Sequence, residues 1–232
     1  MQIVESTAWA LRSARLTLIS AQSKVRITLF PMLHVGTPEY FEAVFADAFE
    51  HDVVLVEGVK SPSSKRIGRS YRWIQDTKAM NLVIQPAYPI SAQCRATIVN
   101  ADLSGEEFTK VWRNIPLYVR ASVFFLAPAV GIARRWFGSR KTLAKGMTLD
   151  DLAERREVLD LRPETLALAR AILRVRDARL TDRLREQLAG ISAEPRRIAV
   201  VYGARHMRAV LRDLSRRGFH VSYAEWLTVF PI

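Results

Sequence analysis

The stretch "RIAVVYGARHMRAVLRDLSRRGF", residues 197–219, decides the fold predicted for this chain. Its first part, Arg197 to Tyr202, is apolar and β-branched, which indicates a buried strand. Apolar residues then recur at helical spacing up to Gly218, which is a natural helix end. His206 therefore lies where the strand turns into the helix. In open α/β sheets ligands bind at such turns, because the carboxyl ends of strands and the positive helix N-termini meet there.

A similar unit lies near the start of the chain. Val25 to Phe30 is predicted to be a strand, Thr37 an N-cap and Pro38 the first residue of an amphipathic helix. A second apolar strand, Val53 to Val59, follows and contains Glu57. The strand–helix–strand order implies parallel pairing and a right-handed crossover.

The remaining chain supplies further strands and a long helical region. Leu82 to Gln85 and Ala96 to Asn100 are predicted to be strands. From Leu149 the pattern is helical, with a break near Pro163 and an end at Gly190. The predicted fold class is therefore α/β, with a mixed, mostly parallel sheet flanked by helices.

The length and composition fit one domain. The chain has 232 residues, of which 49% are hydrophobic, enough for a single sizeable core. We expect one α/β domain over residues 1–232. Within it, residues 113–147 are expected to form an apolar and basic helical insertion between the sheet-forming halves, and residues 149–190 a long helical segment.

The formal net charge of +12 raises the question of an anionic partner. However, 28 of the 35 basic residues are arginines spread over the whole chain, and no nucleic-acid-binding motif accompanies them. We therefore do not expect nucleic acid as a partner. Cys94 is the single cysteine and the first twenty residues lack a signal-peptide pattern, so a cytoplasmic location is expected.

One apolar segment needs a membrane test. Residues 121–133 are uninterrupted by charge but fall short of the roughly 20 residues that a spanning helix needs. The basic residues that follow, among them Arg134 and Arg135, would allow peripheral contact with an anionic membrane surface. The alternative, which we favour, is a helical hairpin packed over the sheet.

The late helix carries charge on an otherwise apolar face. Asp177 occupies a gap in the apolar stripe, and Arg176 lies beside it. A buried or half-buried Arg and Asp must be paired, since an isolated buried charge is costly. A structural ion pair that fixes the helix and a functional role are both open at this point.

The two ends of the chain also resemble each other. Each runs strand, histidine, amphipathic helix, strand and glutamate, so that His34 and Glu57 correspond to His206 and Glu225. This pattern suggests an internal repeat that brings two histidines to one edge of one sheet. Two imidazoles and a carboxylate suit a divalent ion such as manganese, cobalt or zinc. Such an ion would activate water, with Glu57 as third ligand or general base.

Four segments carry a resemblance to a known family. "FPMLHVG" followed by a helix and "VVLVEG", then "VNADLS", "RVRDARLTDRL" and "VVYGARHM" occur in this order over about 180 residues. The chain resembles the TraB/PrgY/GumN and Tiki group, within the wider erythromycin-esterase-like and ChaN-like superfamily. The second GxxH motif of that group is intact, and ends in His206.

The resemblance implies a metal-dependent hydrolase, peptidase-like as in the Tiki branch, that acts on a peptide or small-molecule substrate. It implies His34, Glu57 and His206 around the metal ion. The same resemblance assigns Arg176 to the catalytic set and adds Asp102 and Asp177, which match the aspartates of two family motifs.

The first GxxH motif departs from the family pattern. It reads Pro31, Met32, Leu33 and His34, with proline where the family has glycine. Proline fixes φ near −65° and has no N–H to donate. The alternative hypothesis is therefore a non-catalytic protein that binds a peptide or small ligand on the same fold.

Overall fold

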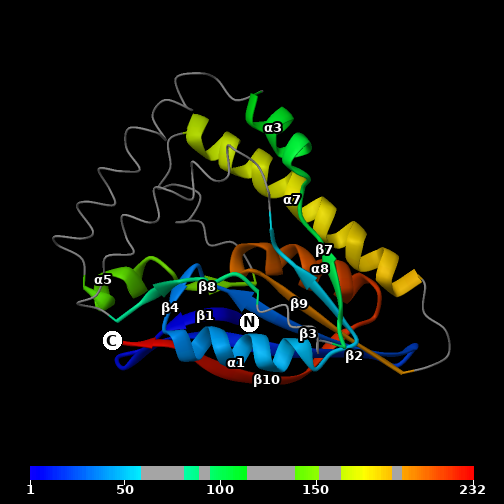
Figure 1. Ribbon diagram of the computed structural model, residues 1–232, viewed down its shortest axis with the longest axis horizontal. Coiled ribbons are helices and arrows are strands. Elements are labelled where there is room, and N and C mark those ends of the chain that lie inside the picture. The colour runs from blue at the N-terminus through cyan, green and yellow to red at the C-terminus, as the bar shows by residue number, and fades with distance from the viewer. Residues whose placement is uncertain (59–80, 89–94, 114–138, 152–162, 190–194) are drawn as a thin grey trace.

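The structure is a computed structural model of the 232 residues, and it describes residues 1–58, 81–88, 95–113, 139–151, 163–189 and 195–232. A single mixed sheet of eight strands, in the order β7-β5-β9-β3-β2-β1-β8 with β10 paired to β2, forms its centre (Figure 1). Helices flank this sheet, so the predicted α/β class with a mixed sheet is confirmed.

The parallel half of the sheet contains β3 (Ser23–Met32), β5 (Val53–Val56), β7 (Thr97–Asn100) and β9 (Arg196–Gly203). β9 lies between β3 and β5 and pairs in parallel with both, so that Val200 has Leu29 on one side and Leu55 on the other. These three residues are fully buried. Continuous apolar runs are typical of parallel strands covered on both faces, which explains why the sequence predicted them.

The antiparallel half was only partly predicted. β1 (Gln2–Ser6), β2 (Ala10–Ser20), β8 (Leu149–Asp150) and β10 (His220–Pro231) form it. Because Leu149–Asp150 is a strand paired with β1, the prediction of helix from residue 149 is wrong at its start.

The long β10 pairs antiparallel with β2 along nearly its whole length. The second strand–helix–strand unit therefore does not repeat the first, in which β3 and β5 are parallel. The predicted internal repeat is wrong at this point, because β10 lies in the antiparallel half of the sheet, where it pairs with β2.

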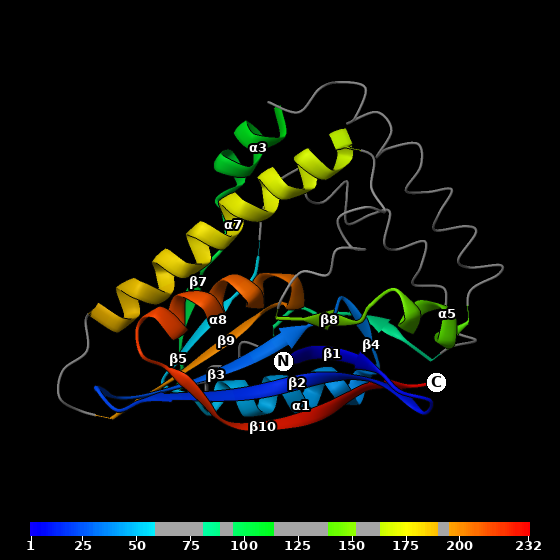
Figure 2. The same ribbon diagram turned by 180° about the vertical axis from the view of Figure 1, so that it is seen from behind.

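Helix α1 (Pro38–Phe49) covers one face of the sheet and α8 (Met207–Arg216) the opposite face, as Figures 1 and 2 show. Thr37 caps α1 by accepting a hydrogen bond from the Tyr40 N–H at 3.4 Å, and Pro38 is its first residue, both as predicted. Gly218, with a φ of 78°, follows the end of α8 in a left-handed conformation that favours glycine.

Helix α7 (Pro163–Ala189) runs beside α8 and buries Leu180 and Leu184 completely. An ion pair between Arg185 and Asp213, with Nη2 and Oδ1 2.6 Å apart, joins the two helices. The long helix predicted before Gly190 is thus present. It starts at Pro163. Proline has no N–H, but at this position none is needed, because the first N–H groups of a helix have no partner within the helix.

Three smaller helical elements and a short sheet complete the described chain. They are α3 (Gly105–Arg113), α5 (Arg140–Lys145), the 3-10 turn η2 (Ala204–His206), and the pair β4 (Val35–Gly36) and β6 (Val83–Ile84). The apolar segment 121–133, and with it most of the predicted insertion 113–147, lies outside the described residues. Among the described helices, none combines the length and the apolar character needed to cross a membrane.

Candidate functional site

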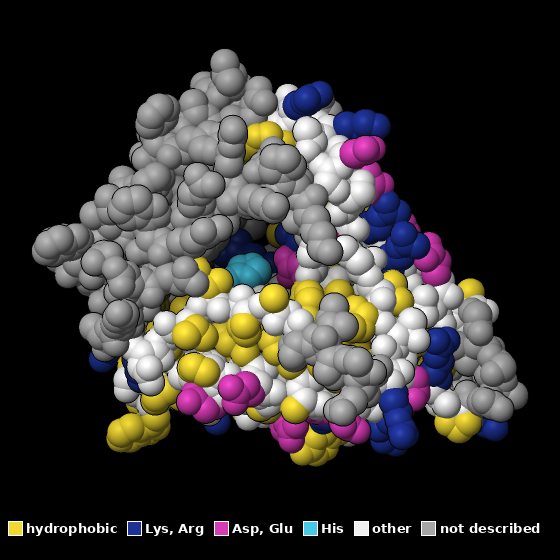
Figure 3. All heavy atoms as spheres, in the orientation of Figure 1, with side chains coloured by type: hydrophobic (Ala, Val, Ile, Leu, Met, Phe, Trp, Pro, Cys, Tyr) yellow, Lys and Arg dark blue, Asp and Glu magenta, His cyan; other side chains and the backbone are white. Residues whose placement is uncertain are grey.

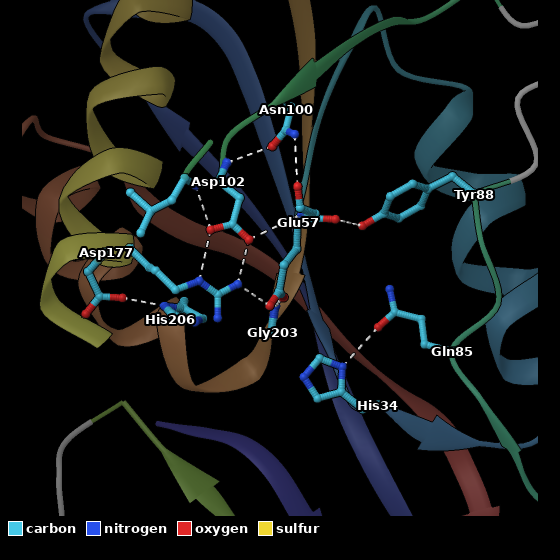
Figure 4. Close-up of polar contacts among 12 residues, drawn as sticks. His34, Glu57, Gln85, Tyr88, Asn100, Asp102, Asp177, Gly203 and His206 are labelled. Atoms are coloured by element: carbon cyan, nitrogen blue, oxygen red, sulfur yellow. Dashed lines mark hydrogen bonds and ion pairs between the residues drawn. The ribbon is translucent and has the colours of Figure 1, made fainter. Parts of the chain in front are cut away.

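The predicted charged residues gather at the carboxyl edge of the parallel strands (Figure 4). Glu57 follows β5, Asp102 follows β7, and Gly203 ends β9. Helix α7 lies across this edge and brings Arg176 and Asp177 to it. Glu57, Asp102 and Arg176 therefore come from three separate elements that meet only in the folded chain.

Arg176 and Asp102 form a two-pronged ion pair. The Arg176 Nε donates to Asp102 Oδ1 at 2.9 Å and its Nη2 to Oδ2 at 2.6 Å. The Asp102 side chain is fully buried, and it also accepts hydrogen bonds from the backbone N–H groups of Leu103 and Gly58. Asn100 holds this loop by bonding the Asp102 N–H and the Gly58 carbonyl. A buried carboxylate is tolerated here because each oxygen has charged or backbone donors.

Glu57 is the second carboxylate on the same guanidinium. Its Oε1 accepts from Arg176 Nη2 at 2.5 Å, and its Oε2 accepts from the Gly203 N–H at 2.6 Å. A Cβ at position 203 would lie 3.0 Å from Oε2, closer than a side chain is normally accommodated. A side chain at position 203 would therefore push the Glu57 carboxylate aside by a few tenths of an ångström, and glycine avoids this. The Tyr88 hydroxyl donates to the Glu57 backbone carbonyl.

The Arg176 guanidinium is a permanent charge at this site. Burial by itself would lower the pKa of Arg176, but the hydrogen bonds to Asp102 and the charge of Glu57 outweigh burial and raise that pKa above its ordinary value. The guanidinium carbon lies 5.5 Å from the centre of the Tyr202 ring. Burial raises the pKa of Tyr202, so its phenol stays neutral.

His206 and Asp177 form a separate pair. The His206 Nδ1 lies 2.6 Å from Asp177 Oδ1, and His206 is only 4% exposed. The Tyr202 ring packs edge-on against the imidazole, with ring centroids 4.8 Å apart. With its Nδ1–H donated to the carboxylate, a neutral His206 keeps its lone pair on Nε2. Within the described residues, no hydrogen bond engages that Nε2.

His34 lies at the same edge but in a different setting. It is exposed, and its Nδ1 lies 3.4 Å from Gln85 Oε1. His34 is followed by the short strand β4, and α1 begins only after it. His206, in contrast, is the last residue of η2, and α8 follows directly. The two histidines are therefore not at equivalent turns, contrary to the prediction. Figure 3 shows a hollow on this face, in which histidine, acidic and basic side chains are visible.

The side chains of the predicted metal ligands His34, Glu57 and His206 do not lie close enough together to bind one metal ion. No three His, Cys, Asp or Glu side chains among the described residues are placed to hold a metal ion. Both Glu57 oxygens already accept hydrogen bonds, one of them from a guanidinium whose charge opposes a cation. The residues described do not complete a metal centre, and the divalent ion stays a prediction.

The proline of the first motif has a structural explanation. Pro31 lies inside β3 opposite Tyr202, and Met32, not Pro31, lies opposite Gly203. The Pro31 carbonyl accepts a hydrogen bond from Ser13 Oγ at 2.6 Å. Pro31 is therefore part of the packing of β3. It makes no contact that corresponds to the one between Gly203 and Glu57.

Some site residues were missed by sequence reasoning, and the role of Glu225 was left open by it. Tyr88 and Asn100 act through backbone groups, for which the sequence gives no signal. Tyr202 stands directly before the GxxH glycine, and an aromatic residue at that place was a usable signal. Glu225, which corresponds to Glu57 in the sequence pattern, lies within β10 and pairs with Arg15 at 3.4 Å, away from the network around Arg176.

Comparisons with protein-family models, with curated proteins and with solved structures found no match. The fold and the site geometry are therefore the basis on which a function is proposed, and the resemblance to the TraB and Tiki group stays a prediction from motifs.

Proposed function

We propose that the protein is a hydrolase in which His206 and Asp177 activate the attacking water. The observation that carries the proposal is the 2.6 Å contact from His206 Nδ1 to Asp177, which leaves Nε2 without a partner in the described structure. A neutral imidazole held in this tautomer takes a proton from water through Nε2. The carboxylate fixes the ring and stabilises the imidazolium that forms.

Arg176 supplies the positive charge that such a reaction needs. Its Nε and Nη2 are held by Asp102 and Glu57, and none of these contacts uses Nη1. A guanidinium held rigidly on one side presents its remaining N–H groups in a fixed direction. There it would hold a substrate carboxylate or the oxyanion formed during hydrolysis. A peptide or a small ester is the substrate class that fits these roles.

A more specific form of this proposal is that the hydrolysis depends on a bound metal ion. A bound manganese, cobalt or zinc ion would lower the pKa of its water and supply hydroxide near neutrality. Its test is elemental analysis of protein purified without chelator, repeated for His34→Ala and His206→Ala. Loss of metal in both variants supports a metal centre, and metal content unaffected by both removes it.

The hydrolase proposal is tested with chromogenic peptides and p-nitrophenyl esters. We expect His206→Ala to lower kcat/KM by about 100-fold or more, in the range of general-base catalysis. His220→Ala, at an exposed position on β10, is the matched control and should leave kcat/KM unchanged. Equal turnover by the native chain and the His206 variant would overturn the assignment.

One observation favours a second candidate, a non-catalytic ligand-binding protein. Each carboxylate oxygen of Glu57 and Asp102 accepts at least one hydrogen bond inside the network, as expected of a structural anchor. This candidate predicts peptide binding that is equal with and without EDTA, and no product after long incubation. Multiple turnover would rule it out.

A further inference from the structure

A groove of about 510 Å³ lies far from the candidate site, on the face of the sheet that α1 covers. Strands β2, β3, β9 and β10 form its floor, and the end of α1 borders it. Arg26 and Arg197 line it near the start of their strands, six residues before Met32 and Gly203. At ~3.3 Å per residue this separates the groove from the candidate site by about 20 Å.

Two arginines on neighbouring strands line this groove. Arg26 on β3 lies directly opposite Arg197 on β9 in the parallel register. Both residues are exposed, and neither side chain makes a hydrogen bond or ion pair with any described residue. Like charges side by side on neighbouring strands are destabilising unless an anion bridges them.

The third arginine of the groove shows the contrast. Arg15 donates to both oxygens of Asp47, at 2.5 and 3.2 Å, and also pairs with Glu225. Its charge is therefore matched within the described structure. Glu50 at the rim is a single exposed carboxylate beside two open guanidiniums.

His51 lines the groove and is largely buried. Burial lowers the pKa of His51, and the charges of Arg197 and Arg15 act in the same direction against the opposing influence of Asp47. The imidazole therefore stays neutral near pH 7 and adds no positive charge to that of the arginines.

We propose that this groove binds a small phosphorylated molecule, with its phosphate between Arg26 and Arg197. A phosphate group accepts from two guanidiniums at once, which removes the repulsion between them. The Tyr223 ring, 53% exposed, stands at the groove and offers a flat surface for the organic part of the ligand. The volume lies within the range of about 300–1,000 Å³ for small-molecule sites. The proposal is independent of the proposed hydrolase function.

The test is isothermal titration of the full chain with pyrophosphate and with AMP as probes. Arg26→Gln and Arg197→Gln should each weaken binding at least tenfold, and Arg216→Gln should not. Arg216 is an exposed arginine at the end of α8, on the other face of the sheet, so it matches the change in net charge. Far-UV circular dichroism of each variant confirms that the fold is intact.

Three results would overturn the proposal. The first is no heat with either probe at low ionic strength. The second is equal weakening by Arg216→Gln, which would mean that net charge alone attracts the anion. The third is tighter binding of a twelve-nucleotide oligo-dT than of AMP, lost in both groove variants, which would make the groove a nucleic-acid contact instead.

Discussion

The Gly203 backbone N–H donates to Glu57 Oε2 at 2.6 Å and so ties the end of β9 to the residue that follows β5. A side chain would crowd this contact, because a Cβ on residue 203 would lie 3.0 Å from the same oxygen. One backbone hydrogen bond thus links the two central strands to the guanidinium that Glu57 also binds.

Gly203→Ala should therefore destabilise the protein by about 1 to 3 kcal/mol, because the Glu57 carboxylate must shift away from both its donors. Urea denaturation followed by circular dichroism measures the change. Gly146→Ala is the control, since no atom of the described residues lies within 4 Å of a Cβ built there and its φ is −93°. A loss of the same size at both positions would contradict the crowding argument.

Arg176→Met should cost about 3 to 5 kcal/mol of stability, because it leaves the fully buried Asp102 without its cation. On the same helix, Arg179→Gln removes an exposed pair with Glu107 and should cost below about 1 kcal/mol. The free energies of unfolding of the two variants are compared with that of the native chain. Similar losses would show that Arg176 does not compensate a buried charge.

Asp177→Asn should lower kcat by about 100-fold or more and leave the fold intact, because the amide no longer holds His206 in the required tautomer. Steady-state kinetics on the best chromogenic substrate, together with thermal unfolding, measures both effects. Asp182→Asn, one turn further along α7 and paired with Arg185 at the surface, is the control. Unchanged kcat in the Asp177 variant would remove the His206 pair from the mechanism.

The free energy of unfolding should decrease as the pH falls, because of His51. Burial lowers the pKa of His51 below its ordinary value of about 6.5, so the unfolded chain takes up a proton first. The contribution of neutral His51 is present above pH 6.5 and is lost as the pH falls through the lower folded-state value. In addition, the protonated ring would turn a donor toward Thr28 Oγ1, which lies 2.8 Å from Nε2.

The measurement is the free energy of unfolding in urea between pH 7.5 and pH 5. His51→Gln should flatten this dependence, and His220→Gln, at an exposed position, should leave it as in the native chain. A native pH dependence that survives in the His51 variant would assign the effect to other groups.

The sequence predicted the parallel half of the fold because its strands are buried on both faces. The runs at Val25 to Phe30 and Val53 to Val59, and the cap at Thr37, all appear in the structure near their predicted places. β1 and β2 were missed because strands with a half-exposed face mix polar and apolar residues. The partner of β10 was missed because it lies about 200 residues earlier in the chain.

Sequence reasoning named Glu57, Asp102 and Arg176, which the structure brings together, but it did not give the pairing. The cost of a buried charge required partners for Arg176 and Asp177, and both have them. Asp102 and Glu57 pair with Arg176, whereas Asp177 pairs with His206, because neighbouring residues on a helix point in different directions. Sequence spacing alone could not show this, nor that His34 would lead into β4.

The central place of β9 has a consequence for how the protein is made. During synthesis β3 and β5 leave the ribosome at least 140 residues before the strand that must lie between them. Until β9 arrives, each has an unpaired backbone edge and exposes apolar side chains to water, and closing so long a loop is slow. Chaperone contact with the nascent chain should be greatest in this interval and end once β9 is inserted.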